Sequence, residues 1–162
     1  MITSIIAEKI AQTTIKDMGL INSERETNIN GNRIKCFIFW VIINKEKNVW
    51  VAGEIFTNSD GFIINFYNNK IFRQIGKNYS ETLVNFHQRI KEINNSSEVK
   101  KNGKNILHFF GHIREFPAWL EIKSIITINY KLSEEEFQKD FQQKLQEIID
   151  IIKQKWPYDL LE

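Results

Sequence analysis

Residues 33–43, RIKCFIFWVII, are apolar on both faces of a β-strand, and this stretch decides the fold. Because successive side chains of a strand point to opposite faces, two apolar sets alternate along it. One set is Ile34, Cys36, Ile38, Trp40 and Ile42, and the other is Phe37, Phe39, Val41 and Ile43. A strand that is apolar on both sides needs something packed over each face, so we expect it at the centre of a domain.

Two further strands follow the central one. The polar run over residues 44–48 predicts a turn, and residues 49–56 predict the second strand. Residues 58–61, NSDG, are typical of a tight hairpin turn, and residues 62–67 then form a third strand. The three strands together predict an antiparallel meander.

Capping residues indicate one helix before this meander in the sequence and one helix after it. Thr3 or Ser4 can cap the first helix, which Gly19 ends. Its apolar arc is wider than contact with one sheet requires, so the helix either lies between the sheet and another helix or is shared with a second subunit. Ser80 can cap the second helix, which extends to about residue 93 with an apolar inner side.

The remaining elements complete an α+β fold. Residues 106–113 and 119–130 predict two more strands, and the second of these is apolar on one face and polar on the other. Ser133 and Glu136 form a capping box for an amphipathic closing helix. We predict one α+β domain over residues 1–162, with a five-stranded antiparallel sheet flanked by helices in the order α-β-β-β-α-β-β-α.

Composition and charge limit the classes of function. The chain has 22 Lys and Arg against 20 Asp and Glu, and proteins that hold nucleic acid usually show a clear basic excess. The one cysteine, Cys36, lies in the most apolar strand, where burial is expected rather than reactivity. Glu8 and Lys9 interrupt the N-terminal apolar run, and the longest apolar run, residues 36–43, falls short of the ~20 residues of a spanning helix. We expect a cytoplasmic protein without membrane or nucleic-acid partners.

Glu121 and Lys123, on the last predicted strand, are the sharpest catalytic candidates. In nucleases of the restriction-endonuclease-like class, the carboxylate of a Glu-x-Lys strand holds a divalent metal and the ammonium orients water. Such a site needs a second acidic residue, and residues 114–118 contain no Asp, while Glu54 and Asp60 lie on other predicted elements. The exposed face of any half-buried strand also supplies two such polar residues. The sequence has no nucleophile elbow, Walker loop, dinucleotide loop or paired-cysteine site, so we predict no cofactor and no metal and keep the nuclease as the alternative.

The predicted sheet carries more aromatic surface than one helix layer obviously covers. Each of these aromatic residues has a core position as its alternative, but part of the set is expected to face a partner protein. The candidate binding residues are Trp40, Trp50, Phe56, Phe66, Tyr67, Phe109 and Trp119.

The order of elements resembles the fold of type III secretion chaperones and related chaperone-like bacterial domains. The closest local parallels are the opening helix that ends in Met18-Gly19-Leu20 and the closing helix over residues 133–156. The resemblance implies a homodimer whose apolar patches hold an extended segment of a partner. The slightly basic charge and the polar loop over residues 94–105 depart from that family. Roadblock-like and profilin-like domains also place helices beside an antiparallel sheet.

These observations lead to one hypothesis about function. We expect a non-catalytic protein-binding module of chaperone, immunity or phage- and defence-accessory type, acting through an apolar sheet or helix surface. Self-association as a homodimer would use the first helix or the sheet. If all the helices pack on one side of the sheet, the other face is the binding surface.

Overall fold

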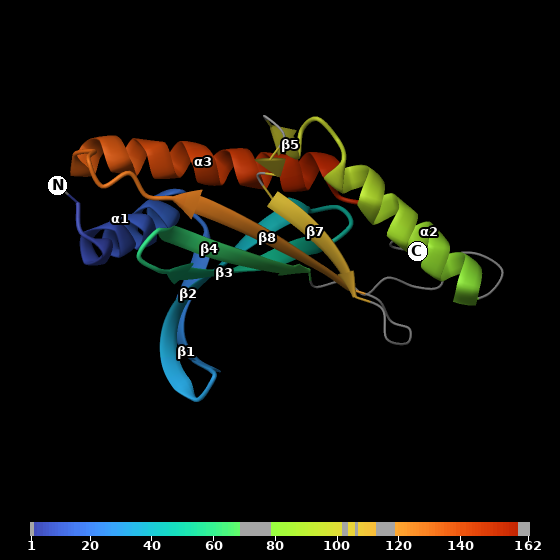
Figure 1. Ribbon diagram of the computed structural model, residues 1–162, viewed down its shortest axis with the longest axis horizontal. Helices are drawn as coiled ribbons and strands as arrows, with labels where there is room; N and C mark the ends of the chain where they lie inside the picture. Colours follow the sequence, from blue (N-terminus) through green and yellow to red (C-terminus); the bar gives the residue numbers. More distant parts are fainter. Residues whose placement is uncertain (1, 69–78, 102–103, 106, 113–118, 159–162) are drawn as a thin grey trace.

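The computed structural model describes residues 2–68, 79–101, 104–105, 107–112 and 119–158 (Figure 1). The elements in these ranges are α1 (Ser4–Asp17), β1 (Ile21–Ile29), β2 (Asn32–Asn44), β3 (Val49–Thr57), β4 (Gly61–Asn68), α2 (Tyr79–Asn94), β5 (Lys100–Lys101), β6 (Lys104–Asn105), β7 (Leu107–His112), β8 (Trp119–Thr127) and α3 (Glu134–Lys155). Among the described helices, none is long and apolar enough to cross a membrane.

The main sheet has six strands in the order β1-β2-β3-β4-β8-β7, and all neighbours are antiparallel. The α+β class and the antiparallel sheet flanked by helices are therefore confirmed. The predicted count of five strands was wrong, because β1 adds an edge strand before the predicted meander. The short strands β5 and β6 form a separate hairpin within the predicted polar loop.

Strand β1 was missed because its sequence, INSERETNI, has no apolar face. Its only apolar residues, Ile21 and Ile29, stand at its two ends, so the period-two pattern that marks a half-buried strand is absent. The strand forms because the chain reverses at Asn30 and Gly31, which have φ angles of 52° and 82°. Positive φ at both central residues is the type I′ hairpin turn, whose twist matches that of the flanking strands.

All three helices lie on the same side of the sheet. Helices α1 and α3 run next to one another over one face, while α2 packs beside the edge strand β7 (Figure 1). Ala7, Ala11 and Ile15 of α1 are buried in the common core. The wide apolar arc of α1 is therefore explained by its position beside α3, although self-association through it stays a prediction.

The helix ends follow the predicted caps in two of three cases. The Thr3 side chain accepts from the amide of Ile6 at 3.2 Å, and Ser133 with Glu136 forms the capping box of α3. Helix α2, however, begins at Tyr79, so Ser80 lies inside the helix and does not cap it.

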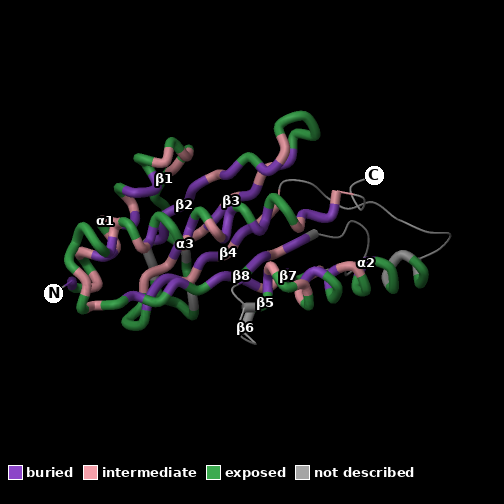
Figure 2. The backbone as a smooth tube through the Cα atoms, turned by 90° about the horizontal axis from the view of Figure 1, so that it is seen from above, coloured by how far each residue is buried: buried purple, intermediate pink, exposed green. Residues whose placement is uncertain are grey.

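The core depends on one set of side chains of β2. Phe39 is fully buried and meets Phe66 of β4 edge to face, with ring centroids 5.8 Å apart. A Cβ added to Gly53 of β3 would lie 2.6 Å from the Phe39 ring, so this site requires glycine. Further along β4, the ring of Phe62 lies 5.2 Å from that of Phe141 in α3. The alternation of buried and less buried residues is visible along β3 and β4 (Figure 2).

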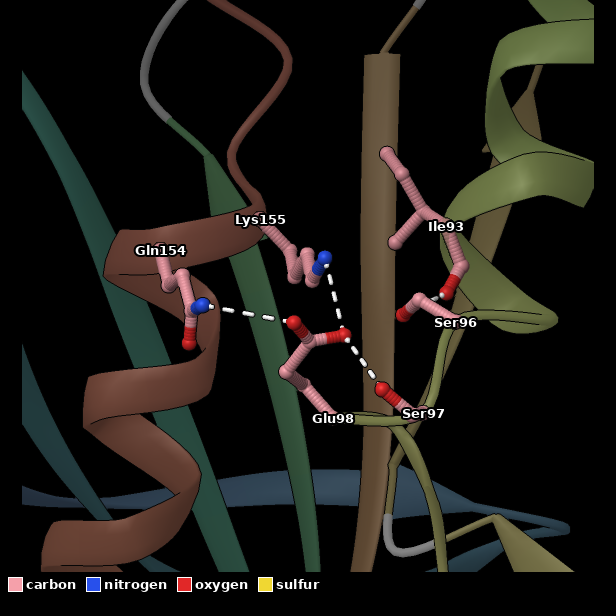
Figure 3. A network of polar contacts seen from close by, with 6 residues as sticks. All are labelled: Ile93, Ser96, Ser97, Glu98, Gln154 and Lys155. Atoms are coloured by element: carbon pink, nitrogen blue, oxygen red, sulfur yellow. Dashed lines mark hydrogen bonds and ion pairs between the residues drawn. The ribbon is translucent and has the colours of Figure 1, made fainter.

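Glu98 ties the segment after α2 to the end of α3 (Figure 3). Its carboxylate lies 3.0 Å from the ammonium of Lys155 and accepts a hydrogen bond from Gln154 at 3.5 Å. The hydrogen bond from Lys155 lowers the pKa of Glu98. The Lys155 charge also complements the partial negative charge at the carboxyl end of α3.

Asn94, the last residue of α2, occupies the outer edge of β7. Its side-chain oxygen accepts from the amide of Phe109 at 2.8 Å, and its side-chain nitrogen donates to the Phe109 carbonyl at 2.9 Å. An edge strand exposes backbone groups that can pair with another chain. The Asn94 amide pairs with this part of the β7 edge as a neighbouring strand would.

Phe62→Ala is expected to lower the free energy of unfolding by about 3–5 kcal/mol, because the deletion leaves a cavity against α3. Ile125→Ala, at a side chain that is 68% exposed, is the control and is expected to change it by less than about 0.5 kcal/mol. Urea unfolding of both variants measures the difference. A loss below about 1 kcal/mol for Phe62→Ala would contradict the packing of the Phe62 ring against Phe141 of α3.

Asn94→Ala is expected to accelerate hydrogen exchange at the Phe109 amide by about tenfold, because both backbone groups of that residue lose their partner. The exposed neighbour Asn95→Ala is the control and should leave that amide unchanged. Equal exchange in the two variants would show that Asn94 does not protect the β7 edge.

Candidate functional site

The strand registers assign the predicted aromatic residues to two faces of the sheet. In antiparallel pairs, directly opposed residues point to the same face. Trp40 of β2 opposes Ala52 of β3, which opposes Tyr67 of β4. Trp50 opposes Ile42, so it shares this face with Trp40. Phe56 lies four residues from Ala52 on β3, and also points away from the helices. All four candidates are partly exposed.

Phe66 and Phe109 lie on the opposite face, beneath the helices. Their side chains are 0% and 1% exposed and belong to the common core. These two candidates therefore occupy the core position that the sequence analysis gave as the alternative. The side chain of Trp119 lies outside the described residues.

Additional apolar residues extend the surface formed by the four exposed candidates. Phe110 of β7 opposes Glu121, and Ile125 of β8 opposes Ile63 of β4. We call this surface the helix-free face and define it by its apolar members, Ile21, Trp40, Ile42, Trp50, Phe56, Ile63, Tyr67, Phe110 and Ile125. No helix of the described ranges packs on it (Figure 1).

The β1–β2 hairpin curls away from the helices and forms one wall of this face (Figure 1). Arg25 of β1 forms an ion pair with Glu54 of β3, which spans the intervening strand β2. Cys36 and Ile38 of β2 are only 4% and 6% exposed, although they point away from the helices. The ion pair and the curled hairpin explain this cover, since Arg25 opposes Cys36 and Glu54 opposes Ile38.

Burial also changes the acidity of two groups on the helix-free face. It raises the pKa of the Cys36 thiol, and the hydrogen bond with Arg25 only partly offsets this effect. Cys36 is therefore buried and protonated at neutral pH, as the sequence predicted. Burial raises the pKa of Tyr67 as well, and the negative charges of Glu121 and Glu54 add to the shift. The two carboxylates thus flank one phenol.

Glu121 and Lys123 project from β8 on the helix-free face. Lys123 opposes His108 on one side and Asn65 on the other. Within the described residues there is no cluster of three or more His, Cys, Asp or Glu side chains that could hold a metal. Besides Glu121, the nearest carboxylate across the strand register is that of Glu54, which forms an ion pair with Arg25. A metal site that used Glu54 would have to break this ion pair. A catalytic role for Glu121 and Lys123 stays a prediction.

Comparison with known proteins adds no assignment. No protein-family model matches the chain, and no curated protein matches it either.

Glu121→Gln is expected to lower the pKa of Tyr67, because a nearby negative charge disfavours the phenolate. A pH titration of phenolate absorbance, corrected with Tyr67→Phe, measures the change. The pKa of Tyr67 in the folded protein exceeds its value of about 10 in the unfolded chain. Tyr67 therefore contributes stability that is complete below the unfolded pKa and is lost as the pH rises through the folded pKa. Glu135→Gln on α3 is the control. An equal change in the pKa of Tyr67 in both variants would show that the charge of Glu121 does not act on Tyr67.

Proposed function

We propose that this chain is a non-catalytic protein-binding module and that the helix-free face is its binding surface. The observation that carries the proposal is the distribution of exposed apolar side chains. The six large hydrophobic residues that are most exposed in the described ranges are Ile5, Ile21, Ile42, Val84, Phe110 and Ile125. Four of them lie on the helix-free face, whereas single exposed apolar residues are normally scattered over a surface.

The composition of the face supports a protein as the partner. Aromatic residues and Arg are enriched at the centres of protein interfaces, and here Arg25, Trp40 and Tyr67 lie on β1, β2 and β4 of one sheet face. The Arg25–Glu54 pair adds a fixed polar contact among the apolar residues. A surface of this mixed kind provides apolar anchors and a polar element that sets orientation.

The kind of partner is part of the proposal. A chaperone, immunity or phage- and defence-accessory role would each hold another protein on this face, and a homodimer would use it to bind a second copy. A cytoplasmic location fits these roles. The isologous arrangement of a homodimer would place the same apolar residues of both copies against each other.

Site-specific photo-crosslinking tests the proposal directly. With p-benzoylphenylalanine in place of Ile125 or Phe110, we expect a discrete crosslinked protein in the native host. The same group in place of Gln142, which is exposed on the far side of α3, is the matched control and should give no such product. A product of twice the 19.2 kDa chain mass would identify a second copy as the partner. The absence of a product at both positions of the face would refute the proposal.

A further inference from the structure

Strand β2 is longer than its partner on the outer side of the sheet. Pairing of β1 with β2 begins at Ile21 opposite Trp40, and in the described residues no strand pairs with the next part of β2, residues 41–44, on that side. The chain enters β1 from α1 through Gly19, whose φ of 76° turns it away from the line of the strand. Backbone groups of a strand alternate between its two sides, so part of this stretch presents donors and acceptors outward.

A groove of about 690 Å³ runs along this unpaired stretch. Ile149 of α3 and Val41 belong to its helix side, whereas Trp40, Ile42 and Trp50 belong to the helix-free face. Residues from both faces of one strand can line a groove together where it passes the edge or the end of that strand, and Leu20 and Ile21 in the lining place it at the edge beside β1. We call it the β2-edge groove.

An extended segment is the occupant that this geometry fits. A strand added beside residues 41–44 would pair its backbone with β2 and point alternate side chains toward α3 and toward Trp40. A stretch of four residues corresponds to about 13 Å of strand. One carbonyl is already used, because the Tyr158 hydroxyl donates to Ile43 at 3.4 Å, and the added strand would pair with the remaining outward groups.

The charge of the groove selects among extended segments. Its lining includes Lys45 and Lys153 but no carboxylate, and its other residues are mostly apolar. Both lysines are exposed, so they can bind an acidic side chain of a partner at the rim. Apolar residues in alternation with a carboxylate at the end therefore complement the groove.

We propose that the β2-edge groove binds an extended acidic-apolar peptide segment of a partner protein by strand addition to residues 41–44. This inference deepens the proposed function and rests on it, since Trp40, Ile42 and Trp50 also belong to the helix-free face. The added strand would lengthen the sheet where β1 ends.

The probe is an acetylated and amidated heptapeptide, Glu-Val-Thr-Val-Thr-Val-Glu, whose two acidic ends serve either strand direction. Titration into ¹⁵N-labelled protein is expected to shift the amide signals of residues 41–44. The same peptide with alternate backbone nitrogens methylated is the matched control and should bind at least about tenfold more weakly, because it retains the side chains but loses backbone donors. Replacing both Glu residues by Lys should also reduce the affinity, and less so at high salt.

Protein variants separate the groove from exposed apolar positions elsewhere on the protein. Ile42→Lys places a charge at a 59% exposed position of the groove and should abolish peptide binding, since lysine at an edge opposes strand pairing. Val84→Lys, at a 65% exposed position of α2 outside the helix-free face, should leave peptide binding intact. Lys45→Glu combined with Lys153→Glu should weaken binding of the acidic peptide by about tenfold.

Three results would overturn the inference. The first is equal binding of the methylated peptide or signal shifts outside the groove. The second is the absence of peptide binding. If crosslinking at Ile125 nevertheless succeeds, strand addition is refuted and the proposed function is not. The third is a dimer, measured by sedimentation, that becomes a monomer in Ile42→Lys and persists when the peptide is added. This result would show that a second copy of the chain occupies the groove. Peptide binding without crosslinks would uphold the groove and refute the helix-free face.

Discussion

The need to cover β2 on both faces determines the rest of the structure. Phe37, Phe39 and Val41 on one face are covered by the helix layer, and Gly53 leaves the space that the Phe39 ring fills. Because all three described helices pack on that side, Cys36 and Ile38 must be protected in another way. The curled β1–β2 hairpin and the Arg25–Glu54 pair provide that protection only where β1 is present. Burial of the helix-free face is therefore uneven, because its covered part lies beside β1, whereas Phe110 and Ile125 are exposed on β7 and β8.

The sequence was sufficient for the strands that bury an apolar face and insufficient for the one that does not. Strands β2, β3, β4, β7 and β8 follow the predicted elements, whose periodicity reflects contact with the helices. Strand β1 is stabilised by pairing with β2, a long-range property that its own polar sequence does not encode. Only the Asn30-Gly31 dipeptide, a strong hairpin signal, could have indicated it. The position of α2 beside β7 likewise depends on tertiary contacts, such as those of Asn94.

The same reasoning explains which candidate residues point outward and which lie in the core. Tyr67 shares one face of β4 with the polar residue Asn65, whereas Phe66 shares the other face with Ile64. Polarity within β4 therefore already distinguishes an outward from an inward set. In β7 the outward set contains His108, which leaves Phe109 facing the core. Aromatic content alone could not make this distinction, because it counts both faces together. Strand register was also required to bring Trp40, Tyr67 and Phe110 from separate strands onto one surface.

Strand β1, which is shorter than β2, links the helix layer to the open edge of β2. Gly19 turns the chain from α1 into β1, and this turn lets α1 lie beside α3 while β1 starts opposite Trp40. A β1 long enough to cover residues 41–44 of β2 would use up residues 18–20 and reach Asp17, the last residue of α1, so the turn at Gly19 could not form. The β2-edge groove is thus a consequence of the turn at Gly19 that places α1 beside α3. Because the core enforces that packing, the groove is present without a ligand, and a strand that enters it would need little rearrangement of the chain.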